Sequence, residues 1–332
     1  MKFYLVFIVQ IFKSLSFSRV WNYIRLAISF VFSAYFKIHR FKSLPAFISI
    51  EPTNICNLHC PECPTGNKSS IVPKGKMEFE LCKKIIPQIK KHVIFTNLYF
   101  QGEPFVNDNM IDIIKLAHSE RILTSISSNA HFITKDNAEE IVKSGLTKII
   151  ISLDGHNQRT YEKYRRNGQF PKVIEGLTAI RDAKMKLHSS LPLVELQCLL
   201  FNHTEINTKK IQAIGKRYKV DIIKFKTAQF YDSQNIEMLP SDKNSRYDVD
   251  GNGELSIKKD LKNKCWKMWS SSIIAWNGNV VPCCFDKNHI FTFGNVQNQP
   301  FEEIWHSAKY QDFRKHIHTN RREIKMCQNC SE

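Results

Sequence analysis

Along most of the chain, short apolar runs alternate with segments whose apolar residues recur at helical spacing. Met110, Ile113, Ile114 and Ala117, for example, follow the pattern of one buried helix face. The expected strands are residues 47–51, 97–100, 122–127, 148–153, 193–201 and 221–226, and the expected helices include residues 77–90, 110–117, 134–145, 173–180 and 206–218. Six strands that alternate with helices predict an α/β fold, in which a parallel sheet with crossover helices curls into a full or partial barrel.

Polar residues follow several of these expected strands. They are a first cysteine cluster, Gly102-Glu103, Ser128-Asn129, Asp154-Gly155 and Asn202. In parallel α/β folds the chemistry lies at the carboxyl ends of the strands, because those ends meet at one edge of the sheet. The agreement between the strand pattern and the polar placement predicts an enzyme whose site lies at that edge.

Three of the ten cysteines form one short cluster, Cys56-x3-Cys60-x2-Cys63. In a reducing compartment, closely spaced thiols are metal ligands rather than disulfides. Three thiolates are one too few for a closed iron–sulfur or structural zinc site, and the missing ligand leaves an iron open to a substrate or cofactor. The alternative is a zinc knuckle that His59 or His92 completes.

The loop Cys-Asn-Leu-His-Cys-Pro-Glu-Cys after the first strand resembles the signature of the radical S-adenosylmethionine (SAM) superfamily. The resemblance covers residues 48 to about 230 and implies a partial (β/α)6 TIM-like barrel. It also implies that Cys56, Cys60 and Cys63 bind a [4Fe–4S] cluster, whose fourth iron takes the amino and carboxylate groups of SAM. Once reduced by a donor such as flavodoxin or ferredoxin, the cluster would cleave SAM to methionine and a 5′-deoxyadenosyl radical, which abstracts a substrate hydrogen atom.

Further motifs support this resemblance. The turn Gln-Gly-Glu-Pro at residues 101–104 resembles the family's Gly-Gly-Glu-Pro turn, which holds the amino group of SAM, although Gln101 replaces the first glycine. Arg165 matches the position that meets the SAM carboxylate, and a solvated helix arginine is the alternative. Glu62 departs from the family, where an aromatic residue before the third cysteine packs near adenine. The SAM-binding residues that the resemblance implies are Gly102, Glu103, Pro104, Ser127, Asn129, Ser152, Asp154, Arg165 and Asn202.

The alternation of strands and helices stops after about residue 231. Residues 236–260 are polar and rich in Ser, Asp, Asn and Gly, which is typical of a linker. Residues 261–332 are rich in Cys and Trp, which predicts a separate small module organised by metal. The expected organisation is therefore an N-terminal helical extension (1–46), a radical SAM core (47–235), a linker (236–260) and a C-terminal module (261–332).

The opening Cys-x12-Gly-x4-Cys of the C-terminal module resembles that of the SPASM and twitch extensions of the family, and a Cys-x2-Cys pair follows. The four ligands that this resemblance implies are Cys265, Cys283, Cys327 and Cys330. Four thiolates complete one auxiliary [4Fe–4S] cluster, as in the shorter twitch form, and a four-cysteine zinc ribbon is the alternative on spacing alone. Because successive side chains of an extended segment face opposite ways, Cys284 is expected to point away from this cluster.

The first 46 residues are apolar and basic. Seven Lys or Arg and no Asp or Glu precede Glu51, in a chain whose formal net charge is +17. Cations mixed with aromatic and aliphatic residues predict helices that lie on an anionic membrane surface, and the alternatives are amphipathic helices that cap the domain or a transmembrane helix. Residues 3–12 lack a following signal-peptide cleavage site, so we expect a cytoplasmic protein, with a peripheral position at the inner membrane as the alternative. No nucleic acid is expected as a partner, because no RNA-binding aromatic motif or compact basic run accompanies the charge.

These motifs predict a radical SAM enzyme but do not specify its substrate. Relatives with such C-terminal extensions modify peptides, protein side chains, or sugars and aminocyclitols, and the N-terminal segment adds a lipid-linked intermediate to the possibilities. The alternative from another class is a non-catalytic, zinc-binding scaffold protein on a degenerate barrel.

Overall fold

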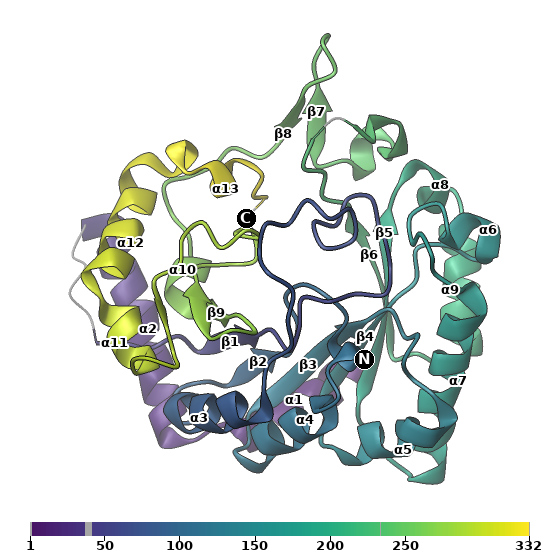
Figure 1. Cartoon of the computed structure of the whole chain (residues 1–332), viewed down its shortest axis with the longest axis horizontal. Coiled ribbons are helices and arrows are strands. Elements are labelled where there is room, and N and C mark those ends of the chain that lie inside the picture. The colour runs from purple at the N-terminus through teal and green to yellow at the C-terminus, as the bar shows by residue number, and fades with distance from the viewer. Residues whose placement is uncertain (1, 37–41, 233, 332) are drawn as a thin grey trace.

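The computed structural model describes residues 2–36, 42–232 and 234–331. Its centre is a nine-stranded sheet in the order β11-β10-β9-β1-β2-β3-β4-β5-β6 (Figure 1). The strands of this sheet are β1 (Phe47–Ile50), β2 (Phe95–Asn97), β3 (Leu123–Ser128), β4 (Lys148–Ser152), β5 (Leu193–Leu200), β6 (Ile222–Thr227), β9 (Ser271–Ile274), β10 (Asn279–Val281) and β11 (Gly294–Asn295). Strands β1 to β6 are parallel and adjacent in chain order, which confirms the predicted six-stranded core. Because β6 and β11 end the described sheet without pairing to each other, the barrel is partial.

Helices cover the convex face of the sheet (Figure 1). The α-helices that follow β1 are α3 (Phe79–Ile89), α4 (Met110–Ser119), α5 (Lys135–Lys143), α6 (Gln158–Tyr161), α7 (Phe170–Lys186), α8 (Asn202–Glu205), α9 (Thr208–Arg217), α10 (Lys267–Ser270), α11 (Phe301–His306), α12 (Ala308–Asn320) and α13 (Lys325–Gln328). Most expected elements lie within one or two residues of these bounds. The second strand is an exception, because it begins at Phe95 and the segment from Leu98 onward already forms the turn that follows it.

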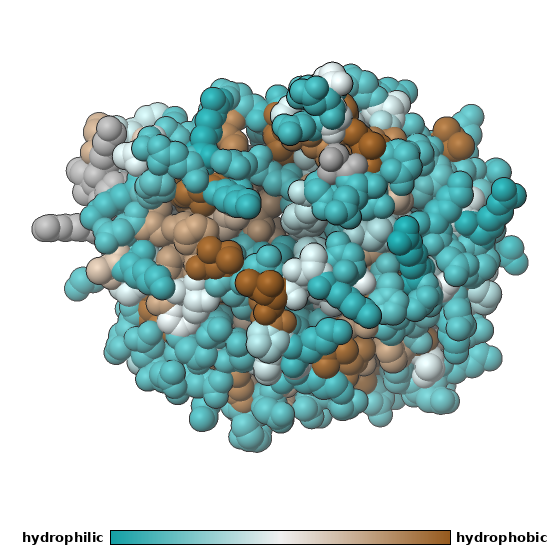
Figure 2. All heavy atoms as spheres, turned by 45° about the horizontal axis from the view of Figure 1, so that its top comes forward, coloured by the Kyte–Doolittle hydropathy of each residue, from teal (hydrophilic) through white to brown (hydrophobic). Residues whose placement is uncertain are grey.

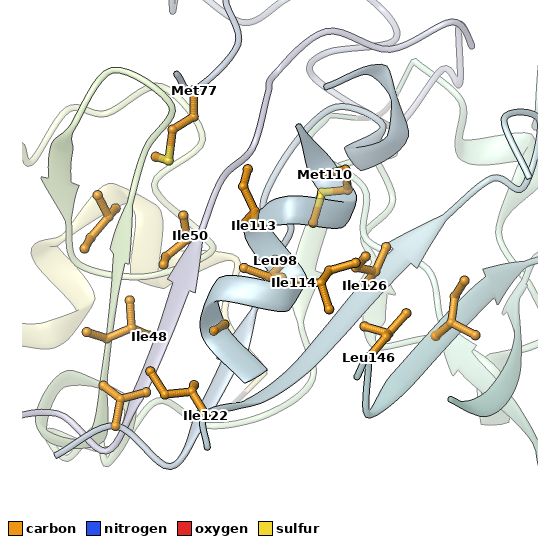
Figure 3. Close-up of a cluster of buried hydrophobic side chains, with 14 of the residues drawn as sticks. Ile48, Ile50, Met77, Leu98, Met110, Ile113, Ile114, Ile122, Ile126 and Leu146 are labelled. Atoms are coloured by element: carbon orange, nitrogen blue, oxygen red, sulfur yellow. The ribbon is translucent and has the colours of Figure 1, made fainter. Parts of the chain in front are cut away.

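The main hydrophobic core fills the space between the sheet and its outer helices. Figure 3 shows Ile113 and Ile114 of α4 beside Leu98 and Ile126, and all four side chains are almost fully buried. The buried face of α4 is the one that its apolar spacing predicted. The outward side chains of the strands pack into this core, and the alternate side chains point to the concave face of the barrel.

The C-terminal residues continue the barrel sheet instead of forming a detached module. Strand β9 pairs in parallel with β1, and Phe47 lies opposite Ser271 in this register. Strands β10 and β11 then add in antiparallel fashion. This arrangement covers the edge of β1, whose backbone groups would otherwise lack partners. The expected linker is also structured, because it contains the hairpin of β7 (Tyr247–Val249) and β8 (Leu255–Ile257).

Two helices, α1 (Lys2–Ser14) and α2 (Phe17–Phe36), precede the barrel and pack against it. The ring of Phe7 contacts that of Phe95 at the start of β2, with 6.0 Å between centroids. Arg19 is 3% exposed, and its guanidinium donates to the carbonyls of Lys90, Glu120 and Arg121, which precede β2 and β3. The bend between α1 and α2 is therefore fastened to the amino-terminal ends of the strands.

Neither of these helices meets the requirements of a membrane span on its own. No single helix in the described ranges is long and apolar enough to cross a bilayer. Helices α1 and α2 reach the required length and composition only together, and they are bent by 104° at their junction.

Candidate active site

The loop after β1 holds Cys56, Cys60 and Cys63 at the carboxyl end of the strands. The Cys60 thiol is buried and the other two are half-buried. A second, smaller apolar cluster that includes Leu58 and Phe201 surrounds them. Burial, together with the neighbouring thiols of the loop, raises the pKa of Cys56 to about 12 and that of Cys60 to about 11, and Arg165 opposes the increase at Cys60. Three mutually close thiols in an apolar shell require a cationic centre to hold them as thiolates, and a three-cysteine iron–sulfur cluster supplies one.

The histidines of the zinc alternative have other partners. Nδ1 of His59 lies 2.7 Å from Nδ2 of Asn167. His92 is buried near the opposite ends of the strands, where its Nδ1 lies 2.7 Å from the carbonyl oxygen of Pro45. Within residues 2–36, 42–232 and 234–331, no group of three or more His, Cys, Asp or Glu side chains is arranged to hold a single metal ion.

The turn after β2 packs directly on the cysteine loop. Gly102 has φ of +70°, and a Cβ atom there would lie 2.5 Å from the carbonyl oxygen of Thr53 and 2.7 Å from that of Ile55. The next residue, Glu103, donates its backbone N–H to the Ile55 carbonyl at 2.9 Å. Glycine is needed at residue 102 both for its positive φ and for this close approach. Pro104 follows as the first residue of a short 3-10 helix that ends at Val106.

The Glu103 carboxylate joins this turn to the end of β3. One oxygen accepts a hydrogen bond from the Ser128 hydroxyl at 2.7 Å, and the other accepts from the backbone N–H of Asn129 at 2.7 Å. The Asn129 side chain in turn donates to Oδ1 of Asn57 at 2.8 Å and lies 4.0 Å from the Cys56 sulfur. Burial raises the pKa of Glu103 to about 7, and these hydrogen bonds oppose the increase. The strand pattern placed Ser128 at the end of this strand, but the SAM-binding residues that the resemblance implied include Ser127, one position earlier on β3, and not Ser128.

A buried ion pair lies on the other side of the cysteine loop. Nε of Arg165 donates to Oδ2 of Asp154 at 2.5 Å, and Nη1 lies 3.8 Å from the Cys60 sulfur. The other oxygen of Asp154 accepts the backbone N–H of Leu199 at 2.6 Å. Asp154 follows β4, whose last residue, Ser152, is also buried. Arg165 is therefore not a solvated helix arginine: its charge is directed at the thiol loop.

Two residues that the sequence analysis considered form their hydrogen bonds outside this group. Asn202 is exposed at the start of α8 and donates to the Glu237 carbonyl at 2.5 Å. Glu62 is buried, and its two oxygens accept hydrogen bonds from Asn235 at 2.5 Å and from the backbone of Tyr231 at 3.2 Å. Because Glu62 directly precedes the third cysteine, these hydrogen bonds fasten the cysteine loop to the segment after β6. That contact explains a carboxylate where the family usually has an aromatic ring.

The side chain of Gln101 bridges two loops that are distant in the sequence. Its Nε2 donates to the carbonyl of Lys287 at 2.8 Å, and its Oε1 accepts from the Thr65 hydroxyl at 3.3 Å. Thr65 follows the first cysteine cluster, and Lys287 follows Cys284. The departure from the family's Gly-Gly-Glu-Pro turn therefore connects the two cysteine-bearing parts of the chain.

Four cysteines of the C-terminal region line one small cavity, and they are Cys265, Cys283, Cys327 and Cys330. A guanidinium nitrogen of Arg321 lies 3.3 Å from the Cys330 sulfur. The neighbouring thiols raise the pKa of Cys283, which burial already raises strongly. Cys284 does not line this cavity, and its sulfur lies 3.8 Å from Nζ of Lys267. The cavity thus gathers four thiols, as a closed four-thiolate cluster needs.

Two family models match the chain. Residues 50–195 match the model of the radical SAM superfamily, and residues 265–331 match that of the SPASM iron–sulfur cluster-binding domain. The chain is a radical SAM enzyme with a C-terminal SPASM domain. The matches support SAM, a SAM-binding [4Fe–4S] cluster and auxiliary cluster chemistry as its cofactors, in preference to the zinc-scaffold alternative.

Curated relatives agree with this assignment, and a solved structure shares the fold. The chain is 22% identical to an AdoMet-dependent heme synthase of Methanosarcina barkeri, over 82% of this chain and 84% of the relative. It is 26% identical to the mycofactocin maturase MftC of Mycolicibacterium smegmatis, over 82% of this chain and 73% of the relative. The structure of SuiB from Streptococcus suis bound to SAM superposes with a TM-score of 0.62 at 15% identity, and the match covers 82% of this chain and 68% of SuiB. The names of these relatives refer to different reactions, so the similarity does not identify the substrate of this radical SAM enzyme.

We predict that Cys283 and Cys284 differ in their effect on the auxiliary cluster. Replacing Cys283 by Ala should remove about one cluster's worth of iron, because its sulfur lines the four-cysteine cavity. The matched change Cys284→Ala should leave the iron content unchanged. Iron and sulfide analysis of anaerobically purified protein, with Mössbauer spectra of each variant, makes the comparison. Loss of the cluster in Cys284→Ala with retention in Cys283→Ala would reverse the assignment.

Proposed function

We propose that this enzyme cleaves SAM reductively at a [4Fe–4S] cluster held by Cys56, Cys60 and Cys63, and that it uses the radical so formed to take a hydrogen atom from its substrate. The observation that carries the proposal is the convergence of the thiol loop, the Glu103 turn and the Asp154–Arg165 pair at one end of the barrel. When bound and reduced by a donor such as flavodoxin or ferredoxin, the cluster supplies the electron that breaks a carbon–sulfur bond of SAM. The protein's own part is to bind, orient and desolvate the reactants.

Charge complementarity supports the way in which we propose SAM to bind. The amino group of SAM donates hydrogen bonds that suit the carboxylate of Glu103, which has accepted three hydrogen bonds and retains acceptor capacity. The carboxylate of SAM suits the guanidinium of Arg165, which Asp154 holds through Nε while Nη1 faces the Cys60 thiol. Ser127, Asn129 and Ser152 offer neutral polar groups at neighbouring strand ends, and such groups suit a ribose.

The cysteines of the C-terminal module are evidence for a second cluster close to the substrate. We propose that Cys265, Cys283, Cys327 and Cys330 hold one auxiliary [4Fe–4S] cluster. A cleft of about 950 Å³ lies between this module, the β7–β8 hairpin and the segment after β6. A second cleft of about 530 Å³ borders the first cysteine loop and shares Ser69, Tyr231 and Asp232 with the larger one. Figure 2 shows apolar atoms exposed toward the middle of the molecule, surrounded by hydrophilic ones. A substrate in these clefts would lie between the two cysteine sites.

We further propose that α1 and α2 bind an anionic membrane surface. Of the 21 large hydrophobic residues that are exposed in the described part of the chain, 15 lie on these two helices. The residues that the helices bury include Ser14, Ser29 and Ser33, whereas Phe12 and Phe17 are 69% and 86% exposed. This reverses the pattern of a helix that only covers a protein core. Apolar and aromatic residues toward solvent, in a segment without acidic residues, suit a membrane interface.

The position of these helices suggests an anchoring role. Because Arg19 fastens their bend to the amino-terminal ends of the strands, they lie at the end of the barrel opposite to the cysteine loop. A membrane bound there would leave the clefts near Tyr231 open to water.

The first test concerns the proposed SAM-cleaving cluster. We expect the triple change of Cys56, Cys60 and Cys63 to Ala to abolish formation of 5′-deoxyadenosine from SAM and dithionite, because the cluster loses all three of its protein ligands. The C-terminal cysteines should still retain iron, which serves as the control for folding. Unchanged 5′-deoxyadenosine formation in this variant would refute the proposal.

The second test addresses Arg165. Replacing it by Ala should weaken SAM binding by roughly thirtyfold, since a charge-assisted hydrogen bond contributes about 2 kcal/mol and 1.4 kcal/mol corresponds to tenfold. Equilibrium binding of SAM to the cluster-loaded protein is the measurement. The adjacent and exposed Arg166 provides a matched control, and Arg166→Ala should bind SAM normally. Equal affinities of the two variants would contradict the proposed contact.

The third test concerns the membrane. Deletion of α1 and α2 would expose the barrel, so surface changes are preferable: Leu5, Phe12, Phe17 and Trp21, each more than half exposed, are replaced by Ser. We expect wild-type protein to float with phosphatidylglycerol-containing vesicles, added salt to weaken this binding, and the variant to lose it. Each Lys or Arg near such a surface contributes about 1 kcal/mol.

The matched control for the membrane test replaces exposed hydrophobic residues elsewhere, namely Ile71, Met185 and Ile206, and this variant should still float. Wild-type protein that ignores the vesicles at low salt would contradict the proposal. A wild-type dimer that the helix variant converts to a monomer would instead make this face an interface between copies.

A further inference from the structure

The hairpin of β7 and β8 presents one strand edge to the larger cleft. Figure 1 shows that this hairpin extends beyond the barrel. The cleft of about 950 Å³ is lined by the consecutive residues 254–257, which include all of β8, whereas Tyr247 lines it from β7. Successive side chains of a strand point to opposite faces, so a run of consecutive lining residues means that the edge of β8 faces the cleft.

The pairing register leaves the backbone groups of this edge without partners. The backbone N–H of Lys258 donates to the Arg246 carbonyl at 3.0 Å, so the even-numbered residues of the two strands form the hydrogen-bonded pairs. Because such pairs alternate with non-hydrogen-bonded ones, the N–H and C=O groups of Leu255 and Ile257 point away from β7. These groups form the free edge of β8, and they receive no hydrogen bond from any residue that the structure describes.

Strand β8 packs on the same apolar cluster as the first cysteine loop. The side chains of Leu255 and Ile257 contact the second, smaller apolar cluster, and so do Cys56 and Cys63. Pro64, which directly follows Cys63, also lines the larger cleft. A molecule held along the free edge of β8 would therefore lie beside the proposed SAM-cleaving site.

The base of the hairpin is fixed to both parts of the chain that border the cleft. The Tyr247 hydroxyl lies 2.7 Å from Oδ1 of Asn329 in the C-terminal module and accepts the backbone N–H of Phe230 at 2.9 Å. The guanidinium of Arg246 donates to the carbonyl of Thr227 at the end of β6, at 2.9 Å. These contacts hold the free edge in place at the cleft. A sheet of only two strands is marginally stable, and a third strand would add backbone hydrogen bonds to it.

Exposed apolar side chains accompany the free edge. Outside α1 and α2, six large hydrophobic residues are exposed in the described part of the chain. Tyr231 and Ile290, two of these six, line the cleft. An extended peptide matches such a surface, because its backbone donors and acceptors repeat at the spacing of a strand and its side chains can enter apolar pockets beside it. A sugar or a lipid lacks this repeat.

We propose that the substrate of this enzyme is an extended polypeptide segment that pairs with β8 as a third strand. Its backbone would bond to the N–H and C=O groups of Leu255 and Ile257, and its side chains would contact Tyr231 and Ile290. Unpaired strand edges are templates for such pairing. The paired segment would run along the cleft between the two cysteine sites. The identification of this segment as the substrate rests on the proposed radical SAM function.

The test uses a displayed library of random linear peptides, which is selected on the cluster-loaded, SAM-bound protein. The recovered peptides are synthesised, and their binding is measured by anaerobic calorimetry. Leu255→Pro should bind them at least about tenfold more weakly than wild type, because proline removes the outward N–H and with it a backbone hydrogen bond. Leu255→Ala keeps this N–H and should lose much less affinity.

The matched control is Val249→Pro, which removes the outward N–H of the residue opposite Leu255 on β7 and should bind the peptides as wild type does. All variants are compared at equal iron content, which shows that they fold. Equal weakening by both proline variants, unchanged binding by Leu255→Pro, or a library that yields no binding peptide would overturn the proposal. A wild-type dimer that Leu255→Pro converts to a monomer would make this edge an interface between copies and would also overturn it.

Modified peptides test the pairing without a protein variant. When successive amides of a recovered peptide are N-methylated one at a time, binding should weaken at alternate positions, because only every second N–H of a paired strand faces its neighbour. Weakening that lacks this period of two would contradict strand pairing.

Formation of 5′-deoxyadenosine, measured on the same wild-type samples, separates this inference from the proposed function. Peptide binding that depends on the Leu255 N–H in a protein that cannot cleave SAM would refute the radical SAM activity but leave the β8 site in place. SAM cleavage by a protein that binds no peptide would refute the β8 site alone.

Discussion

The buried carboxylate of Glu103 holds the candidate active site together. Removing a carboxylate from water is costly, and it is tolerated where hydrogen bonds replace the lost hydration. Here the Ser128 hydroxyl and the backbone N–H of Asn129 provide these hydrogen bonds. If the turn after β2 separated from the end of β3, the buried carboxylate would lose them, and this loss would be unfavourable. Asn129 thereby reaches Asn57 in the cysteine loop. The position of three loops from three different strands thus depends on one buried charge.

A second buried charge organises the opposite end of the barrel. The guanidinium of Arg19 replaces its hydration with carbonyl groups of the segments that precede β2 and β3. Because Arg19 and three serines occupy positions on the protein side of α1 and α2, the large apolar residues of these helices are left toward solvent. Composition alone could not distinguish this arrangement from an ordinary capping pair, since the orientation is set by long-range contacts such as those of Arg19 and Phe7. The segment therefore packs on the barrel, as the capping alternative expects, and it also presents an apolar surface to solvent.

The strands and motif positions could be predicted from the sequence because their signals are local. Apolar runs, helical spacing and the Cys-x3-Cys-x2-Cys loop each lie within a few residues, and the parallel order of β1 to β6 follows from the alternation. The pairing of β9 with β1 joins residues that are more than 200 positions apart, and no pattern in either segment indicates with which strand it pairs. The role of Glu62 was hidden for the same reason, because its partners Tyr231 and Asn235 belong to the segment after β6. The contact of Lys148 and Lys224 with the buried Glu195 was hidden likewise, because it joins side chains of three different strands.

Gln101 shows how a departure from a family motif can have a structural reason of its own. A glycine at this position would leave the carbonyl of Lys287 and the hydroxyl of Thr65 without the amide that now lies between them. Lys287 follows the cysteine pair of the C-terminal module, and Thr65 follows the first cysteine cluster, so the amide fixes one loop relative to the other. Glu51 strengthens the same junction, because its buried oxygens accept the backbone N–H groups of Gln101 and Trp276 at 3.3 Å each. A substrate held between two metal sites must meet both at fixed distances, since small displacements of reacting groups are costly to catalysis. The polar contacts of Gln101 and Glu51 provide that rigidity where the barrel sheet and its C-terminal extension meet.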